Sequence, residues 1–220
     1  MLRGTVVALS GMLLFGCAPQ VAQDPGKVNV TVATAKASFY PHELGLQWEF
    51  LLQDDRLDAP PYRMTVEGNT LFGEEVATRF ALVGRGVERE YFRTYTDEGV
   101  YLHGMTVPGA KIALNPPMQE YPSIKAWKVG ARWSGKTQIT LLDGRGVRDK
   151  ADVEYRYTVL DQRTVKLNTS NQSYSVWVVT RQLIGAKDIL PESKEFYFVP
   201  YVGEVLTPDG FVLKSTNAGQ

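Results

Sequence analysis

His42 and His103 are the only two histidines of this 220-residue chain, and they are its first candidates for chemistry. An imidazole can act as a general base or bind a metal ion near neutral pH. With methionine, tyrosine or carboxylate ligands, the two would suit a copper site if the fold brought them together. A metal-dependent redox protein is therefore one hypothesis. Nucleophilic catalysis has less support, because no serine lies in a Gly-x-Ser-x-Gly motif. We therefore predict no catalytic residue and favour a non-enzymatic protein.

Residues 130–137 read Gly-Ala-Arg-Trp-Ser-Gly-Lys-Thr and match the nucleotide-binding pattern G-x-x-x-x-G-K-[ST]. A loop that holds phosphate needs a helix directly after it, so that backbone amides and the helix dipole face the anion. Here Thr137 begins a stretch of alternating, β-branched residues that runs into Asp143-Gly144. Such a stretch predicts a strand and a hairpin. We therefore expect neither a nucleotide nor any other cofactor at the Gly130–Thr137 match.

Aromatic residues are the other chemical resource, with 4 Trp, 11 Tyr and 9 Phe. Their first expected use is core packing on the inner face of a curved sheet. A bent sheet also leaves a concave apolar face that a hydrophobic ligand, such as a lipid or a pigment, can cover. The candidate ligand-binding residues are Trp48, Trp127, Trp133, Tyr155, Tyr157 and Trp177.

The elements that must position these side chains are strands. Every odd residue of 151–159 is apolar and every even one polar, and residues 46–50 and 62–66 alternate in the same way. This period of two is typical of antiparallel strands with one buried face. Helix signals are weak and confined to residues 123–128 and 183–190. We predict a mainly β fold with little helix: an antiparallel, strongly curved sheet, or an open barrel or sandwich. Further strands are expected at 75–83, 88–95, 137–141, 173–182, 195–199 and 211–214.

A repeated pattern suggests two related halves, residues 38–118 and 119–220. Tyr40-Pro41 precedes Gly45-x-x-Trp48, and Tyr121-Pro122 precedes Gly130-x-x-Trp133 about 80 residues later. Each copy is followed by hairpin signals and then by an adjacent aromatic pair. The spacings inside the halves differ, so an ancient duplication is a hypothesis.

Composition limits the partners. The chain has 24 basic and 24 acidic residues and a formal net charge of zero, which gives no electrostatic case for nucleic acid. Cys17 is its only cysteine, so neither a disulfide within the chain nor a cysteine-ligated zinc site is expected.

Cys17 follows a basic residue, Arg3, and an apolar run from Thr5 to Phe15. This is the arrangement of a secretory signal peptide, and the run is too short to span a bilayer, which takes about 20 residues. Leu14-Phe15-Gly16-Cys17 resembles the lipobox of bacterial lipoproteins, in which the cysteine is lipidated and becomes the mature N-terminus. We expect a signal peptide at 1–16, a lipidated Cys17 with a flexible tether through 37, and a β domain at 38–220.

Three further segments resemble an uncharacterised group of bacterial envelope lipoproteins: Leu114–Pro117, Trp127–Trp133 and Val199–Val205. The resemblance implies a bent sheet or open barrel comparable to periplasmic carriers of the LolA and LolB type, and no catalytic residues. It places the protein in the cell envelope, anchored to the membrane through the lipid on Cys17. The outer membrane is favoured over the inner, because Ala18 replaces the aspartate that favours retention.

The resulting hypothesis is a non-enzymatic structural or partner-binding module that contacts another envelope protein. The alternative is a carrier or sensor of a hydrophobic ligand.

Overall fold

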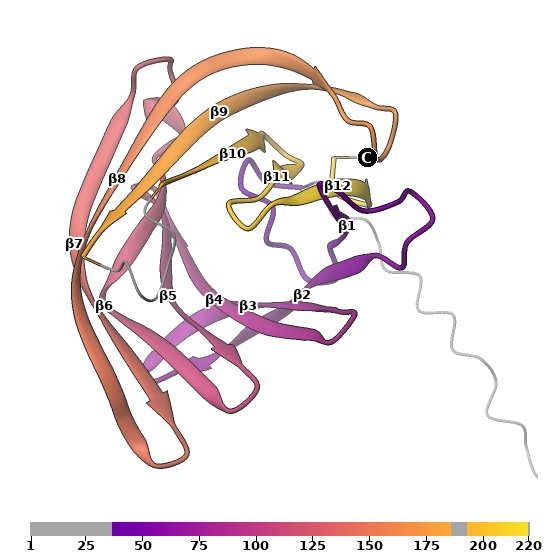
Figure 1. Cartoon of the computed structure of the whole chain (residues 1–220). Coiled ribbons are helices and arrows are strands. Elements are labelled where there is room, and N and C mark those ends of the chain that lie inside the picture. The colour runs from indigo at the N-terminus through magenta and orange to yellow at the C-terminus, as the bar shows by residue number, and fades with distance from the viewer. Residues whose placement is uncertain (1–36, 186–192, 220) are drawn as a thin grey trace, which may run out of the picture. The chain divides into compact units, whose positions relative to one another are not determined.

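The computed structural model describes residues 37–185 and 193–219. The predicted signal peptide, Cys17 and the tether up to residue 36 lie outside them. The described residues form one compact unit. Its twelve strands make a single antiparallel barrel, closed by pairing of the first strand with the last (Figure 1). The strands are β1 (Gln47–Leu52), β2 (Tyr62–Phe72), β3 (Glu75–Gly84), β4 (Val87–Thr96), β5 (Gly99–Val107), β6 (Ala110–Pro122), β7 (Arg132–Asp143), β8 (Gly146–Lys166), β9 (Ser173–Ile184), β10 (Ser193–Val199), β11 (Gly203–Leu206) and β12 (Phe211–Thr216).

The predicted mainly β, antiparallel fold is confirmed, and the barrel is closed rather than open. Each strand pairs with the next one in the chain, and β1 also pairs with β12, where Trp48 lies opposite Thr216. Closure gives every strand two neighbours. The pairing joins the two ends of the domain, which no local pattern in the sequence encodes.

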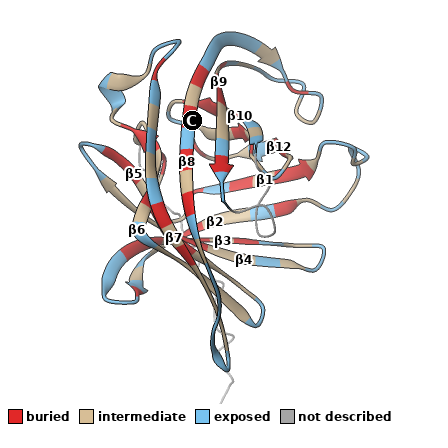
Figure 2. Cartoon of the chain, turned by 60° about the vertical axis from the view of Figure 1, so that its left-hand side comes forward, coloured by how far each residue is buried: buried red, intermediate tan, exposed pale blue. Residues whose placement is uncertain are grey.

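Strand β8 shows how residue alternation builds the wall. Val153, Tyr155, Tyr157 and Val159 are buried, whereas the residues between them are partly or fully exposed. Side chains of successive residues point to opposite faces, so one face of β8 enters the core and the other meets solvent. The register with β9 shifts between Val159 and Asp161, and both long strands curve strongly (Figure 1). Buried and exposed residues alternate along the strands in Figure 2, while the hairpin ends are exposed.

Three strands were missing from the prediction: β5, β6 and the four-residue β11. The prolines of β6 conceal it, because proline cannot donate a ladder hydrogen bond. The β5–β6 register shifts between Leu102 and Gly104. Leu102 pairs with Met118 and Gly104 with Ala113, so Pro116 and Pro117 lie in the unpaired stretch of β6 between those two positions. The prolines therefore occupy positions where no ladder donor is needed.

The two weak helix candidates gave different results. Residues 123–128 contain one short 3-10 turn, η1 (Ile124–Ala126). The prediction for residues 183–190 is wrong where it can be compared, since Leu183 and Ile184 end strand β9; residues 186–190 lie outside the described part. No helix in residues 37–185 and 193–219 is long and apolar enough to cross a membrane.

The two halves of the repeat correspond to six strands each. Trp48 is the second residue of β1 and Trp133 the second of β7. The two Tyr-Pro motifs meet in space: the rings of Tyr40 and Tyr121 stack with centroids 5.4 Å apart, and the Tyr40 hydroxyl donates to the Pro122 carbonyl. Both halves share one sheet, and the predicted boundary at 118/119 falls inside β6. The duplication itself stays a hypothesis.

Candidate ligand-binding cavity

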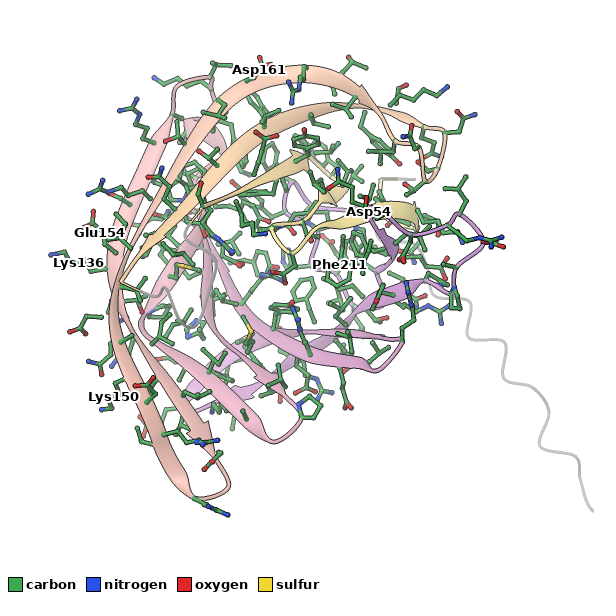
Figure 3. All side chains as sticks on the ribbon, viewed as in Figure 1. Asp54, Lys136, Lys150, Glu154, Asp161 and Phe211 are labelled. Carbon is green, nitrogen blue, oxygen red and sulfur yellow. The ribbon has the colours of Figure 1, made fainter. Side chains whose placement is uncertain are left out.

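The barrel contains a cavity of about 360 Å³. Its walls are mostly apolar side chains on the buried faces of the strands, and Figure 3 shows Phe211 inside the ring of strands. The volume falls in the range of small-molecule sites, which are typically apolar with a few placed polar groups. Six of the apolar lining residues are Leu82, Leu102, Met118, Ile139, Leu183 and Phe211.

Charged side chains line the same cavity. Arg93 on β4 donates from Nε to Oε2 of Glu120 on β6 at 2.5 Å, and its Nη2 lies 3.4 Å from Oε1. The two side chains are only 12% and 13% exposed. A buried charge is tolerated only when it is paired and hydrogen-bonded, and this pair meets that condition.

Glu204 on β11 is the second carboxyl group beside the cavity. Its Oε1 accepts a hydrogen bond from the Tyr121 hydroxyl at 2.5 Å. Burial raises the pKa of Glu204 to about 7, although the charge of Arg93 and the hydrogen bond from Tyr121 oppose the shift. Glu204 therefore exchanges a proton near neutral pH, unlike an ordinary glutamate.

Arg181 on β9 also lines the cavity, but its contacts differ from those of Arg93. Its Nε is buried and has no hydrogen-bond partner in the described part of the chain. Arg181 lies opposite Tyr157 on β8 and hydrogen-bonds its hydroxyl. Burial raises the pKa of the Tyr157 phenol, and the charge and hydrogen bond of Arg181 partly offset that shift. The Tyr157 hydroxyl therefore keeps its proton near neutral pH.

A smaller pocket of about 60 Å³ adjoins the cavity. It shares Met64, Arg93 and Glu204 with the larger cavity and adds Trp48 and Tyr95 to its lining. Arg93 and Glu204 therefore face both spaces.

Trp127 contacts two of the other predicted aromatic residues. The ring centroids of Trp127 lie 6.2 Å from Trp133 and 5.7 Å from Trp177. Trp133 in turn stacks on Tyr157 at 5.0 Å, with the rings 5° from parallel. These four side chains line neither space, and their role in ligand binding stays a prediction.

The other two predicted aromatics lie elsewhere. Trp48 lines the smaller pocket and donates from Nε1 to the Val202 carbonyl at 2.6 Å. Tyr155 covers Gly135 on the neighbouring strand, where an added Cβ would come within 2.3 Å of the Tyr155 hydroxyl oxygen. That oxygen also accepts a hydrogen bond from the Gln119 backbone amide at 3.3 Å. Tyr155 thus packs against Gly135 of β7 and binds the backbone of Gln119 in β6, which are structural contacts.

The two histidines are not brought together. His42 stacks on Tyr95 with ring centroids 3.9 Å apart, whereas Nε2 of His103 lies 3.0 Å from Oγ1 of Thr94. Thr94 and Tyr95 are successive residues of β4, so their side chains point to opposite faces of the sheet. Within residues 37–185 and 193–219, no group of three or more His, Cys, Asp or Glu side chains is arranged to hold a metal ion.

As expected, the nucleotide-binding pattern leads into a strand and not a helix, but that strand, β7, begins earlier than predicted, at Arg132 instead of Thr137. Arg132 to Thr137 belong to β7, and Lys136 points away from the barrel together with its cross-strand neighbour Glu154 (Figure 3). Thr137 donates from Oγ1 to the Pro116 carbonyl at 2.7 Å. The pattern therefore has neither a following helix nor a free loop.

Arg93, Arg181 and Glu204 were not among the predicted site residues. A sequence signal for two of them exists: Arg93 lies between Tyr91 and Tyr95, and Arg181 between Val179 and Leu183, each at the spacing of one strand face. A charged residue in register with apolar ones indicates a charge on the buried face. No family model, curated protein or solved structure matches this chain.

Proposed function

We propose that this protein is a non-enzymatic, lipid-anchored protein of the bacterial cell envelope that binds a small hydrophobic ligand inside its barrel. The observation that carries the proposal is the cavity of about 360 Å³ with its mostly apolar wall. We prefer ligand binding to the structural or partner-binding hypothesis because this cavity is a specific feature that such a role does not require.

The size of the cavity limits the ligand. One water molecule takes up roughly 30 Å³ in the liquid, and a non-hydrogen atom with its hydrogens is of similar size. The cavity therefore has room for about a dozen non-hydrogen atoms. Apolar side chains such as Leu102, Ile139 and Leu183 offer water few partners. An aliphatic chain there gains about 25 cal/mol for each Å² of apolar surface removed from water. A medium-length alkyl chain therefore fits the space.

Native mass spectrometry of protein extracted gently from its own envelope tests the proposal. We expect a co-purifying small molecule with the wild-type chain. The variant Leu114→Trp, which fills the partly buried edge of the cavity, should lose that molecule. Val147→Trp is the matched control, because Val147 is 58% exposed on a hairpin. An unliganded wild-type protein that also binds no added alkyl compound would contradict the proposal.

The membrane anchor needs a separate test, because Cys17 lies outside the described residues. The support for it is the lipobox-like sequence Leu14–Cys17 after the apolar run. In cells given radiolabelled palmitate, the wild-type protein should become labelled and partition into a detergent phase. Cys17→Ser should be unlabelled and remain in the aqueous phase. Equal labelling of both chains would exclude Cys17 as the lipidation site.

A further inference from the structure

The position of Arg181 in strand β9 directs its side chain into the barrel. Val179 and Leu183, two residues away on either side, are buried on the same strand face. Arg181 and Leu183 both line the cavity. The guanidinium of Arg181 is therefore next to an apolar wall rather than at the outer surface.

Arg181 differs from the other two arginines of the cavity in having no carboxylate partner. Arg93 is paired with Glu120 at 2.5 Å, and Arg89 with Asp209 at 2.9 Å. Among residues 37–185 and 193–219, no ion pair includes Arg181, and its buried Nε has no hydrogen-bond partner. A guanidinium has five N–H donors and a permanent charge. Arg181 hydrogen-bonds the Tyr157 hydroxyl, but its buried Nε–H has no partner, and a buried donor left unsatisfied is costly. Such a group calls for an anionic partner.

The charges around Arg181 favour an anion further. Three arginines and three carboxyl groups line the cavity, namely Arg89, Arg93, Arg181, Glu120, Glu204 and Asp209. Glu120 and Asp209 neutralise their own arginines, and Glu204 is held by Tyr121 and is partly protonated near neutral pH. When Glu204 is protonated, these six side chains together carry one net positive charge. Lys194 on β10, the cross-strand neighbour of Arg181, adds a second cation on the same side of the sheet.

We propose that the bound ligand carries an anionic head group, in the simplest case a carboxylate, and that the Arg181 guanidinium binds this head while the apolar wall takes the tail. The inference rests on the proposed function and specifies the ligand class of the same cavity. Arginine suits the role because its planar fork matches the two oxygens of a carboxylate or a phosphate. The Tyr157 hydroxyl hydrogen-bonds Arg181 and donates to Met118 Sδ at 3.9 Å, so Tyr157 positions the guanidinium from outside the cavity.

The test compares three probes with the same ten-carbon tail, decanoate, 1-decanol and decylammonium, by isothermal titration calorimetry. The protein is the full mature chain with Cys17→Ser, purified without detergent, which would compete for the cavity. We expect decanoate to bind at least tenfold more tightly than decylammonium. Arg181→Met should weaken decanoate about tenfold or more and leave 1-decanol unchanged, and Arg181→Lys should restore part of the affinity. Arg163→Met is the control, since Arg163 is 49% exposed.

A second measurement avoids variants, in case Arg181→Met does not fold. The carboxyl carbon of [1-¹³C]decanoate bound to the Cys17→Ser chain should titrate at lower pH than the free acid, because a guanidinium stabilises the anion. Decyl phosphate binding more tightly than decanoate would support an anionic head and identify it as phosphate. Equal affinity for all three probes, with no shift of the carboxyl titration, would overturn the inference and leave the proposed function intact. Binding of none of the probes would overturn both.

Discussion

Arg93 on β4 and Glu120 on β6 form an ion pair across the intervening strand β5, with Nε 2.5 Å from Oε2. The pair therefore ties three strands together from inside the barrel. Burial alone would favour the neutral form of Arg93, but the charge of Glu120 and its hydrogen bond hold the pKa of the guanidinium well above its ordinary value. Each member of the pair makes the burial of the other tolerable.

Removing one member should therefore be costly. Arg93→Met leaves Glu120 buried without its partner and should lower the free energy of unfolding by about 3–5 kcal/mol, measured by urea denaturation. The control is Arg63→Met, which breaks an Arg–Glu pair of similar length, 2.9 Å to Glu49, on the outer surface. An exposed pair is worth about 1 kcal/mol or less. Equal losses in the two variants would contradict a stabilising role for the buried pair.

The alternation of residues predicted most strands but not their closure. In β8 the odd residues from Val153 to Val159 encode the buried face directly. In contrast, the Arg93–Glu120 contact spans 27 residues of sequence, and Arg181 meets Tyr157 only through strand pairing. Such contacts depend on register between strands, which the local pattern does not record. The cavity was inferred from aromatic content, whereas its described wall is mainly aliphatic.

Gly135, in the segment that matches the nucleotide-binding pattern, tests whether packing against Tyr155 requires a glycine at that position. Its backbone is not in the left-handed region, but an added Cβ would lie 2.3 Å from the hydroxyl oxygen and 2.6 Å from Cζ of Tyr155. Gly135→Ala should therefore displace the Tyr155 ring and cost about 1–3 kcal/mol, the usual range for overpacking. Thermal unfolding followed by circular dichroism measures the loss.

Gly144→Ala is the matched control for this experiment. An added Cβ at Gly144 meets nothing within 4 Å, and no positive φ restricts the position. The same substitution there should be neutral or slightly stabilising, because it restricts the unfolded chain. If both alanines had the same effect, contact with Tyr155 would not explain the glycine at 135.

Tyr40 links the two Tyr-Pro motifs through its hydroxyl group. The hydroxyl donates to the Pro122 carbonyl and accepts a hydrogen bond from Trp127 Nε1 at 2.6 Å. Tyr40→Phe keeps the ring but leaves both partners unsatisfied, and should cost about 1–3 kcal/mol in urea denaturation. Tyr101→Phe is the control, since that hydroxyl makes one exposed contact of 3.4 Å to Glu98. A loss at Tyr40 no larger than at Tyr101 would show that the hydroxyl does not stabilise the junction.

Glu204 should make the stability of the barrel depend on pH. Its pKa is about 7 in the folded protein and about 4.5 in an exposed chain, because burial disfavours the charged form. The folded state therefore holds a proton that the unfolded chain releases. This contribution to stability is complete below about pH 4.5 and is lost as the pH rises through about 7. At about 1.4 kcal/mol for each pKa unit, the loss is at most about 3–4 kcal/mol.

Glu204→Gln isolates this contribution, because glutamine has nearly the same shape, accepts the Tyr121 hydrogen bond and does not titrate. Urea denaturation between pH 4 and 8 should show wild-type stability falling relative to the variant, most steeply between about pH 5 and 6.5 and levelling off above about pH 7. Glu195→Gln, at an exposed carboxylate on β10, should follow the wild-type curve. If the stability of Glu204→Gln also followed the wild-type curve over this pH range, Glu204 would have an ordinary pKa. Its partial neutrality could then no longer support an excess positive charge beside Arg181.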